Sequence, residues 1–194
     1  MNFARYAVPA ALVLTVSGCG INSIPTYEEA AKARWADVQA SYQRRADLIP
    51  NLVETVRGFA TQEREVLTQV TQARASATQV QVSPDQLSDP AAVQRFQEAQ
   101  GNLSGALGRL LVTVEKYPEL RSQENFLALQ SQLEGTENRI NVSIRDYNEA
   151  VRVYNTEVRT FPGIIGAKVI HGAKPLTPFQ ATTPNADTAP AVKF

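Results

Sequence analysis

The sequence predicts an all-α protein, an up-and-down bundle of three to four long helices, on three observations. Apolar residues recur at alternating spacings of three and four from residue 35 to residue 80, a period that a strand cannot produce. Prolines and short polar stretches divide the rest of the chain into further segments of the same coiled-coil-like period. Hydrophobic residues make up 43% of the 194 residues, which is enough for a packed core. Because the connections are short, neighbouring helices are expected to run antiparallel.

Charge and residue usage exclude several classes of function. The 19 Lys and Arg residues balance the 19 Asp and Glu residues, so net charge does not favour nucleic-acid binding. One Cys and one His cannot form an intrachain disulfide or a metal site built from several such ligands. We therefore expect no cofactor and no metal role for His171. The sequence also contains no phosphate-binding glycine loop, nucleophile elbow or zinc-helix motif, so no enzymatic activity is predicted.

Residues 1–18 have the pattern of a secretory signal peptide. Arg5 gives a positive start, and the apolar run that follows is too short to span a bilayer. The residues Val16, Ser17, Gly18 and Cys19 resemble the bacterial lipobox. That resemblance implies cleavage before Cys19 and acylation of this residue with diacylglycerol and a fatty acid such as palmitate, which together make a firm membrane anchor. The alternative is an ordinary signal peptide with an incidental cysteine.

The anchor sets the expected organisation of the mature chain. Residues 19–25 are predicted to be a tether, residues 26–170 the helical bundle, and residues 171–194 a disordered tail with few large apolar side chains. The residue after Cys19 is Gly20. An Asp at this position would signal retention. By resemblance to known sorting rules, Gly20 favours the periplasmic face of the outer membrane in a two-membraned bacterium, and otherwise the outer face of the plasma membrane.

The first helix is expected to begin at Thr26, a plausible N-cap, and to follow the apolar stripe to residue 80. Pro50 lies inside this stripe and lacks the amide that would bond to the carbonyl of Ala46. We therefore expect the helix to be kinked or broken near Pro50.

Two charged residues, Arg45 and Glu63, interrupt the apolar stripe of the first helix. A charge on a bundle seam needs a partner, and a single polar residue there often fixes register. The structural interpretation gives each residue an ion-pair partner on a later helix, namely Glu115 or Glu119 for Arg45 and Arg109 or Arg139 for Glu63. The functional interpretation is a recognition patch for a partner or a cell-wall component, formed around Pro50 by Arg44, Arg45, Asp47 and Asn51.

The second helix is expected over residues 93–117 and ends at Pro118. Gly101, Gly105 and Gly108 recur along it and predict close approach to another helix of the same chain; the alternative is a self-association face. The third helix is expected over residues 126–161, followed by a short apolar stretch, residues 163–170, that packs back onto the end of the bundle.

A Tyr-Asn pair occurs twice on the third helix at a spacing of seven residues, as Tyr147 and Asn148 and again as Tyr154 and Asn155. The tyrosines face the seam and the asparagines flank it. The structural interpretation is core aromatics whose hydroxyls reach polar partners. The alternative is a ligand-binding aromatic strip.

Residues 43–63, 70–74, 116–126 and 137–163 carry motifs that resemble those of the LemA family of bacterial envelope proteins, in the same order. The resemblance implies an up-and-down helical bundle that is tethered at its N-terminus and exposed outside the cytoplasm. It implies no known enzymatic activity. Many relatives begin with a transmembrane helix, whereas this chain begins with the lipobox-like signal.

These observations predict a non-enzymatic, lipid-anchored envelope protein that acts as a scaffold or docking module near the membrane. Its expected partners are the membrane, through lipidated Cys19, and envelope proteins whose identity the sequence does not give; nucleic acid is not expected. The alternative is a periplasmic binding module for a small molecule or glycan, with a cleft near Pro50 and the Tyr-Asn repeat.

Overall fold

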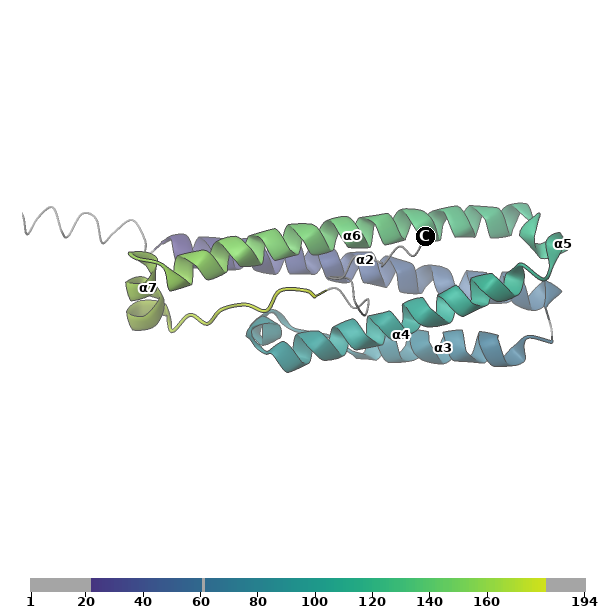
Figure 1. The fold of residues 1–194 in the computed structure, drawn as a ribbon, viewed down its shortest axis with the longest axis horizontal. Coiled ribbons are helices and arrows are strands. Elements are labelled where there is room, and N and C mark those ends of the chain that lie inside the picture. The colour runs from purple at the N-terminus through teal and green to yellow at the C-terminus, as the bar shows by residue number, and fades with distance from the viewer. Residues whose placement is uncertain (1–21, 61, 181–194) are drawn as a thin grey trace, which may run out of the picture.

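The computed structural model describes residues 22–60 and 62–180, and these ranges form helices and loops without a strand, which confirms the all-α class. The signal peptide and Cys19 lie outside the described residues. The long helices are α2 (Ser23–Phe59), α3 (Arg64–Gln79), α4 (Pro90–Val114) and α6 (Glu124–Arg159), and they lie side by side in an elongated, rod-like arrangement (Figure 1). Shorter elements connect or follow them: η1 (Pro84–Ser88), α5 (Pro118–Arg121), α7 (Gly163–Gly166) and η2 (Ala167–His171).

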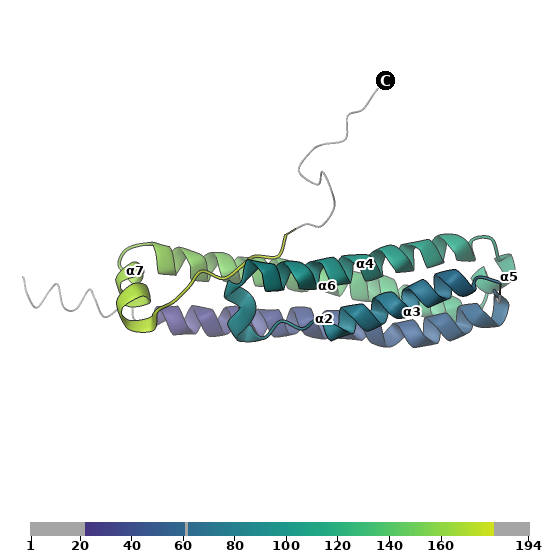
Figure 2. The same ribbon diagram turned by 90° about the horizontal axis from the view of Figure 1, so that it is seen from below.

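Consecutive long helices run antiparallel, as expected from the short connections (Figures 1 and 2). The most extensive contact joins α2 to α6, and α3 packs on both α2 and α4. Helices α2 and α6 have 37 and 36 residues, whereas α3 and α4 have only 16 and 25. One end of the α2–α6 pair is therefore not covered by α3 and α4. None of the helices in the described ranges combines the length and apolar character that a bilayer crossing requires.

Helix α2 begins at Ser23, three residues before the expected start at Thr26. Pro25 lies in the first turn, where the missing amide has no helical partner to lose. The Thr26 hydroxyl donates to the carbonyl of Asn22 at 2.8 Å and does not cap an amide. Residues 23–25 of the expected tether are therefore helical.

Helix α2 continues through Pro50, so the expected alternative of a break at this residue is wrong, whereas a kink there stays a prediction. Pro50 leaves the carbonyl of Ala46 without its helical donor. Arg74 of α3 supplies the donor instead, with its Nε 2.8 Å from the Ala46 oxygen. The orphaned carbonyl is evident from the sequence, whereas the neighbouring helix that satisfies it is not.

The chain reverses between Ala60 and Glu63, which splits the predicted first helix into α2 and α3. The Ala60 amide still bonds to the carbonyl of Val56, and the Glu63 amide bonds to the carbonyl of Ala60. The apolar stripe keeps its phase across this turn, so periodicity alone does not reveal it. Glu63 interrupts the stripe because it stands at the N-cap of α3, outside the helical seam.

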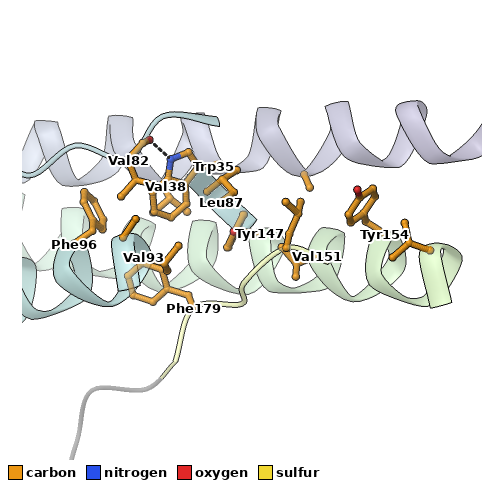
Figure 3. Packing of buried hydrophobic residues seen from close by; sticks show 14 of the residues in the cluster. Trp35, Val38, Val82, Leu87, Val93, Phe96, Tyr147, Val151, Tyr154 and Phe179 are labelled. Carbon is orange, nitrogen blue, oxygen red and sulfur yellow. Dashed lines mark hydrogen bonds between the residues drawn. The ribbon is translucent and has the colours of Figure 1, made fainter. Parts of the chain in front are cut away.

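Two clusters of buried side chains form the core. One surrounds Trp35 at the end of the bundle where α2 and α6 extend past the other helices, and the other surrounds Leu52 and Leu110 where all four helices are present. The Trp35 ring lies 5.2 Å from both the Phe96 and the Tyr147 rings, between centroids. The Trp35 Nε1 group donates to the carbonyl of Val82 at 3.0 Å (Figure 3).

The expectation of a disordered tail from residue 171 is wrong for residues 173–180, which we call the C-terminal segment. This segment is extended and lies along α6 at the end that α3 and α4 leave uncovered (Figure 1). Leu176 and Phe179 are buried in the Trp35 cluster. Burying two such side chains contributes about 1.5–3 kcal/mol each. The segment therefore orders on the bundle although its composition cannot support a core of its own.

The glycines of α4 do not approach another helix, so the expected close packing is wrong. A Cβ added at Gly101 or Gly108 would meet no atom within 4 Å, and one at Gly105 would meet only the end of the Arg109 side chain, at 3.8 Å. The self-association face stays a prediction.

Replacing Gly101, Gly105 and Gly108 together by alanine is expected to raise the free energy of unfolding by about 2–3 kcal/mol, because each helix-interior glycine is less favourable than alanine by about 0.8–1 kcal/mol. Urea unfolding followed by circular dichroism measures this change. Gly163→Ala is the matched control and should destabilise, because its Cβ would collide with the main-chain oxygen of Glu157. A triple variant no more stable than the parent would contradict the prediction.

Candidate functional site

The Tyr-Asn repeat of α6 is the most elaborate polar arrangement around the C-terminal segment. Tyr147 and Tyr154 are almost fully buried, as the seam position predicts. Their hydroxyls donate to main-chain carbonyls of the C-terminal segment, from Tyr147 to Thr177 at 2.8 Å and from Tyr154 to Lys174 at 3.2 Å. Burial raises the pKa of both tyrosines above the usual value, so both hydroxyls remain protonated donors at neutral pH.

The two asparagines of the repeat each hold one residue of the C-terminal segment by both of its main-chain groups. Asn155 donates to the carbonyl of Leu176 at 2.8 Å and accepts from the amide of Leu176 at 2.8 Å. Asn148 does the same with Phe179, at 2.9 and 2.7 Å. An amide side chain has the same donor and acceptor as a peptide group, so each asparagine satisfies the main chain as a neighbouring strand would.

The spacing of the two asparagines matches the spacing of the residues they hold. Seven residues of helix rise about 10.5 Å, and three residues of extended chain span about 10 Å. Asn148 and Asn155 are therefore in register with Phe179 and Leu176. We call the two asparagines and the two tyrosines the α6 ladder.

The sequence of the C-terminal segment suits this arrangement. Pro175 and Pro178 precede the two held residues, and proline favours the extended polyproline conformation with three residues per turn. Proline also has no amide, and the amides at 176, 177 and 179 are the ones that donate, the middle one to the carbonyl of Leu87 at 2.8 Å. Two apolar residues three apart, each after a proline, are the sequence signal that composition alone missed.

Aromatic rings close around Phe179 and form its socket. Its ring lies 6.2 Å from the ring of Tyr42, between centroids. It lies 6.3 Å from the ring of Trp35 and 6.4 Å from that of Phe96 (Figure 3). These rings come from α2 and α4, whereas the main chain of Phe179 is held from α6. Through Phe179, the C-terminal segment thus contacts α2, α4 and α6 at once.

Arg45 is buried, with only 2% of its surface exposed, and its partners differ from those expected. It donates to Ser104 Oγ at 2.8 Å and to Gln100, at 2.9 Å from the side-chain oxygen and 3.2 Å from the carbonyl. Its carboxylate partner is Glu137 of α6, at 3.3 Å, so the predicted pairing with Glu115 or Glu119 is wrong.

The guanidinium of Arg45 also lies 4.9 Å from the ring centre of Tyr42, within range of a cation–π contact. Burial raises the pKa of Tyr42 to about 12, although the charge of Arg45 acts in the opposite direction. The Nε atom of Arg45 is buried without a hydrogen-bond acceptor. Arg45 is thus a structural link between α2, α4 and α6 with one unsatisfied donor.

Of the four residues predicted to form a patch near Pro50, only Arg45 is buried, and the recognition patch stays a prediction. Arg44, Asp47 and Asn51 are exposed on α2, and Asp47 accepts a hydrogen bond from Gln43, one turn earlier, at 2.7 Å.

The structure also places the Tyr-Asn repeat away from Pro50. Tyr147 packs on Trp35, which is 15 residues before Pro50, or about 22 Å along a helix. A hollow of about 260 Å³ adjoins Arg45 between α4 and α6, but its lining contains none of the residues of the α6 ladder. Within the described residues, this hollow therefore does not join the Pro50 region to the repeat.

Glu63 also interrupts the apolar stripe. It does not pair with Arg109 or Arg139, so the expected ion pair is wrong. It accepts a hydrogen bond from the Tyr117 hydroxyl at 3.1 Å, and this bond raises the pKa of Tyr117. The contact joins the α2–α3 turn to the end of α4. In the described ranges, no cluster of three or more His, Cys, Asp or Glu residues is arranged to hold a metal ion.

Comparisons with known proteins agree with the motifs found in the sequence. The magnetosome protein MamQ 2 of Paramagnetospirillum magneticum is 26% identical over 157 residues, which cover 73% of this chain and 58% of that protein. MamQ of Magnetospirillum gryphiswaldense is 25% identical over the same shares. Protein LemA of Metamycoplasma hominis is 24% identical over 124 residues, which cover 64% of this chain and 52% of that protein. The chain thus spans little more than half the length of these curated relatives.

The sequence model of the LemA family matches residues 34–194, a range that includes both the α6 ladder and the C-terminal segment that it holds. The match covers most of the chain. The chain belongs to the LemA family.

Proposed function

We propose that this protein is a lipid-anchored docking module of the cell envelope that holds partner proteins near the membrane and catalyses no reaction. Membership of the LemA family supports an envelope-associated, non-enzymatic protein. The similarity to proteins named for the magnetosome is in keeping with association with a membrane. The lipobox-like residues before Cys19 support the anchor, on the periplasmic face of the outer membrane or the outer face of the plasma membrane.

The observation that carries the docking role is the main-chain recognition made by the α6 ladder. Four of its hydrogen bonds hold the amides and carbonyls of Leu176 and Phe179, which every peptide possesses. Only the buried sites that the Leu176 and Phe179 side chains fill, the two apolar sockets, select side chains. A surface of this kind accepts an extended peptide with apolar residues three apart, and the chain's own C-terminal segment occupies it until a partner segment replaces it.

A labelled peptide with the sequence of residues 173–180 tests this docking role. The double variant Leu176→Ala and Phe179→Ala weakens the binding of the chain's own C-terminal segment and keeps the α6 ladder intact. This variant is expected to bind the added peptide roughly tenfold or more tightly than the parent, because the internal competitor is weakened by more than about 1.4 kcal/mol. Fluorescence anisotropy measures the binding, and circular dichroism checks that the helices remain.

Adding Asn148→Ala and Asn155→Ala to that variant is expected to abolish peptide binding. A peptide in which the residues that match Leu176 and Phe179 are alanine is the matched control ligand and should not bind. If the segment-weakened variant folds but fails to bind the intact peptide, the docking role is wrong.

Replacing Cys19 by serine is expected to leave the fold intact and to release the protein from membranes, because no described residue depends on Cys19 and the acyl chains would be lost. Cell fractionation and mass spectrometry of the mature N-terminus measure the two effects. Ser17→Ala, which keeps a small residue in the signal, is the control and should remain membrane-bound. An unmodified Cys19 in the parent protein would reject the anchor.

A further inference from the structure

One end of the bundle exposes large apolar side chains in an unusual concentration. Phe161 is 75% exposed and Val169 is 78% exposed, and Ile165 and Ile170 are each 55% exposed. In the described ranges, the other large exposed apolar residues are scattered along the helices. We call these four residues the apolar tip. Exposed apolar residues that lie singly are normal, whereas a group within ten residues indicates a contact surface.

The fold of this end does not require these side chains to face solvent. Gly163, Gly166 and Ala167 are buried against the bundle, whereas Ile165, Val169 and Ile170 are exposed. At Gly163 only glycine fits, because a Cβ there would collide with the main-chain oxygen of Glu157. The stretch is therefore inverted relative to an ordinary surface helix, which buries its large apolar residues and exposes small or polar ones.

The apolar tip lies at the end of the bundle where the chain enters from the anchor. Helix α7 contacts both α2 and α6, and the Ser23 hydroxyl at the start of α2 donates to Glu157 at 2.6 Å, near the end of α6 (Figure 1). Cys19 precedes Asn22 by three residues, which span at most about 11 Å. A lipid on Cys19 would thus hold a bilayer within reach of this end.

The charges at this end favour an anionic membrane surface. No acidic residue occurs between Glu157 and Asp187, whereas Arg159, Lys168 and Lys174 are all exposed in this stretch. The first acidic residues of α2 are Glu28 and Glu29, and Lys32 pairs with both, at 2.9 and 3.1 Å. Cations near the surface attract anionic headgroups, and apolar side chains beside them enter the acyl boundary.

We propose that the apolar tip is a membrane-contact surface that inserts into the bilayer beside the anchor and holds the rod of the bundle upright on the membrane. This inference rests on the part of the proposed function that places Cys19 in a bilayer, and it is independent of peptide docking by α6. The tip supplies contact at a second point. A single point of attachment would leave the bundle free to swing, and two contacts at the same end fix its direction.

An environment-sensitive fluorophore on a single cysteine tests the insertion. Residues 20–194 contain no cysteine, and every described contact of the bundle lies within residues 22–180. For the test, residues 20–194 are produced with an N-terminal histidine tag in place of the anchor. The tag tethers the protein to vesicles of phosphatidylcholine and phosphatidylglycerol that contain a nickel-chelating lipid. The fluorophore is attached at Ile165→Cys or, as the matched control, at Val112→Cys, which is 69% exposed on α4.

The Ile165→Cys probe is expected to shift to shorter emission wavelength on tethering and to be quenched by bromine-labelled acyl chains, whereas the Val112→Cys probe should change little. A probe at position 165 that keeps its aqueous emission on tethered protein would overturn the inference. A shift that also occurs without vesicles, together with dimers in light scattering, would overturn it in favour of contact between two copies.

A second measurement uses the same chain without the tag. Replacing Phe161, Ile165, Val169 and Ile170 by serine is expected to weaken its partitioning to these vesicles by roughly tenfold or more. The triple variant Val112→Ser, Leu127→Ser and Val142→Ser removes exposed apolar residues elsewhere and should bind as the parent does. Equal loss in both variants would contradict the inference. Neither outcome depends on acylation of Cys19, so failure of the anchor and failure of the tip are distinguished.

Discussion

Replacing Asn148 and Asn155 together by alanine is expected to release the C-terminal segment while the four long helices stay folded. The double variant loses four hydrogen bonds to the main chain of Leu176 and Phe179. At a net contribution of about 0.5–1.5 kcal/mol each, these bonds stabilise the docked segment by about 2–6 kcal/mol. Hydrogen exchange followed by mass spectrometry should show that the amides of residues 176 and 179 lose their protection.

Asn138→Ala is the matched control for this variant, because Asn138 is an exposed asparagine on the same helix. It should leave the exchange of the C-terminal segment unchanged. If amides 176 and 179 remain protected in the double variant, the apolar sockets hold the segment without the asparagines. The α6 ladder would then not be the basis of docking.

Arg45→Ala is expected to lower the free energy of unfolding by about 3 kcal/mol, as removal of one member of a buried polar network typically does. Gln100 and Ser104 would lose their charged donor, and a cavity would remain beneath Tyr42. Glu137 contributes little to this loss, because its side chain is half exposed and can regain water. Urea unfolding followed by circular dichroism measures the change.

Arg34→Ala provides the comparison for this prediction. Arg34 is an exposed arginine of the same helix, paired with Asp37 at 3.4 Å, and pairs of this kind stabilise by less than about 1 kcal/mol. Arg45→Met should fall between the two alanine variants, because methionine fills much of the space but donates no hydrogen bond. Equal stability of the Arg45→Ala and Arg34→Ala variants would show that the buried guanidinium contributes nothing beyond a surface charge.

The helical stripes predicted most of the fold because helical periodicity is a local property of the sequence. Helix α4 ends shortly before Pro118 and helix α6 ends shortly before Pro162, as the two prolines indicate. The reversal at Ala60 was missed because Val56, Glu63 and Val66 keep the stripe in phase through the turn. Phase therefore predicts which face of a helix is buried and not where the helix ends.

The partners of the polar residues were not predictable, because they depend on how helices align in space. The sequence identified Arg45 and the Ala46 carbonyl as groups in need of partners. Glu137 and Arg74 could be assigned to them only once the α2–α3 reversal was placed. The C-terminal segment was missed for a related reason: its order comes from the unequal lengths of the helices, which leave part of the core open for Leu176 and Phe179.

The C-terminal segment runs antiparallel to α6, and its attachment therefore resists force differently in different directions. Residue 176 is held by Asn155 and residue 179 by Asn148, so the segment runs against the chain direction of α6. A force on residue 180 along the bundle axis loads both asparagines at once in shear, whereas a sideways force unzips Asn148 before Asn155. Tension along the rod would thus be resisted far better than peeling from it.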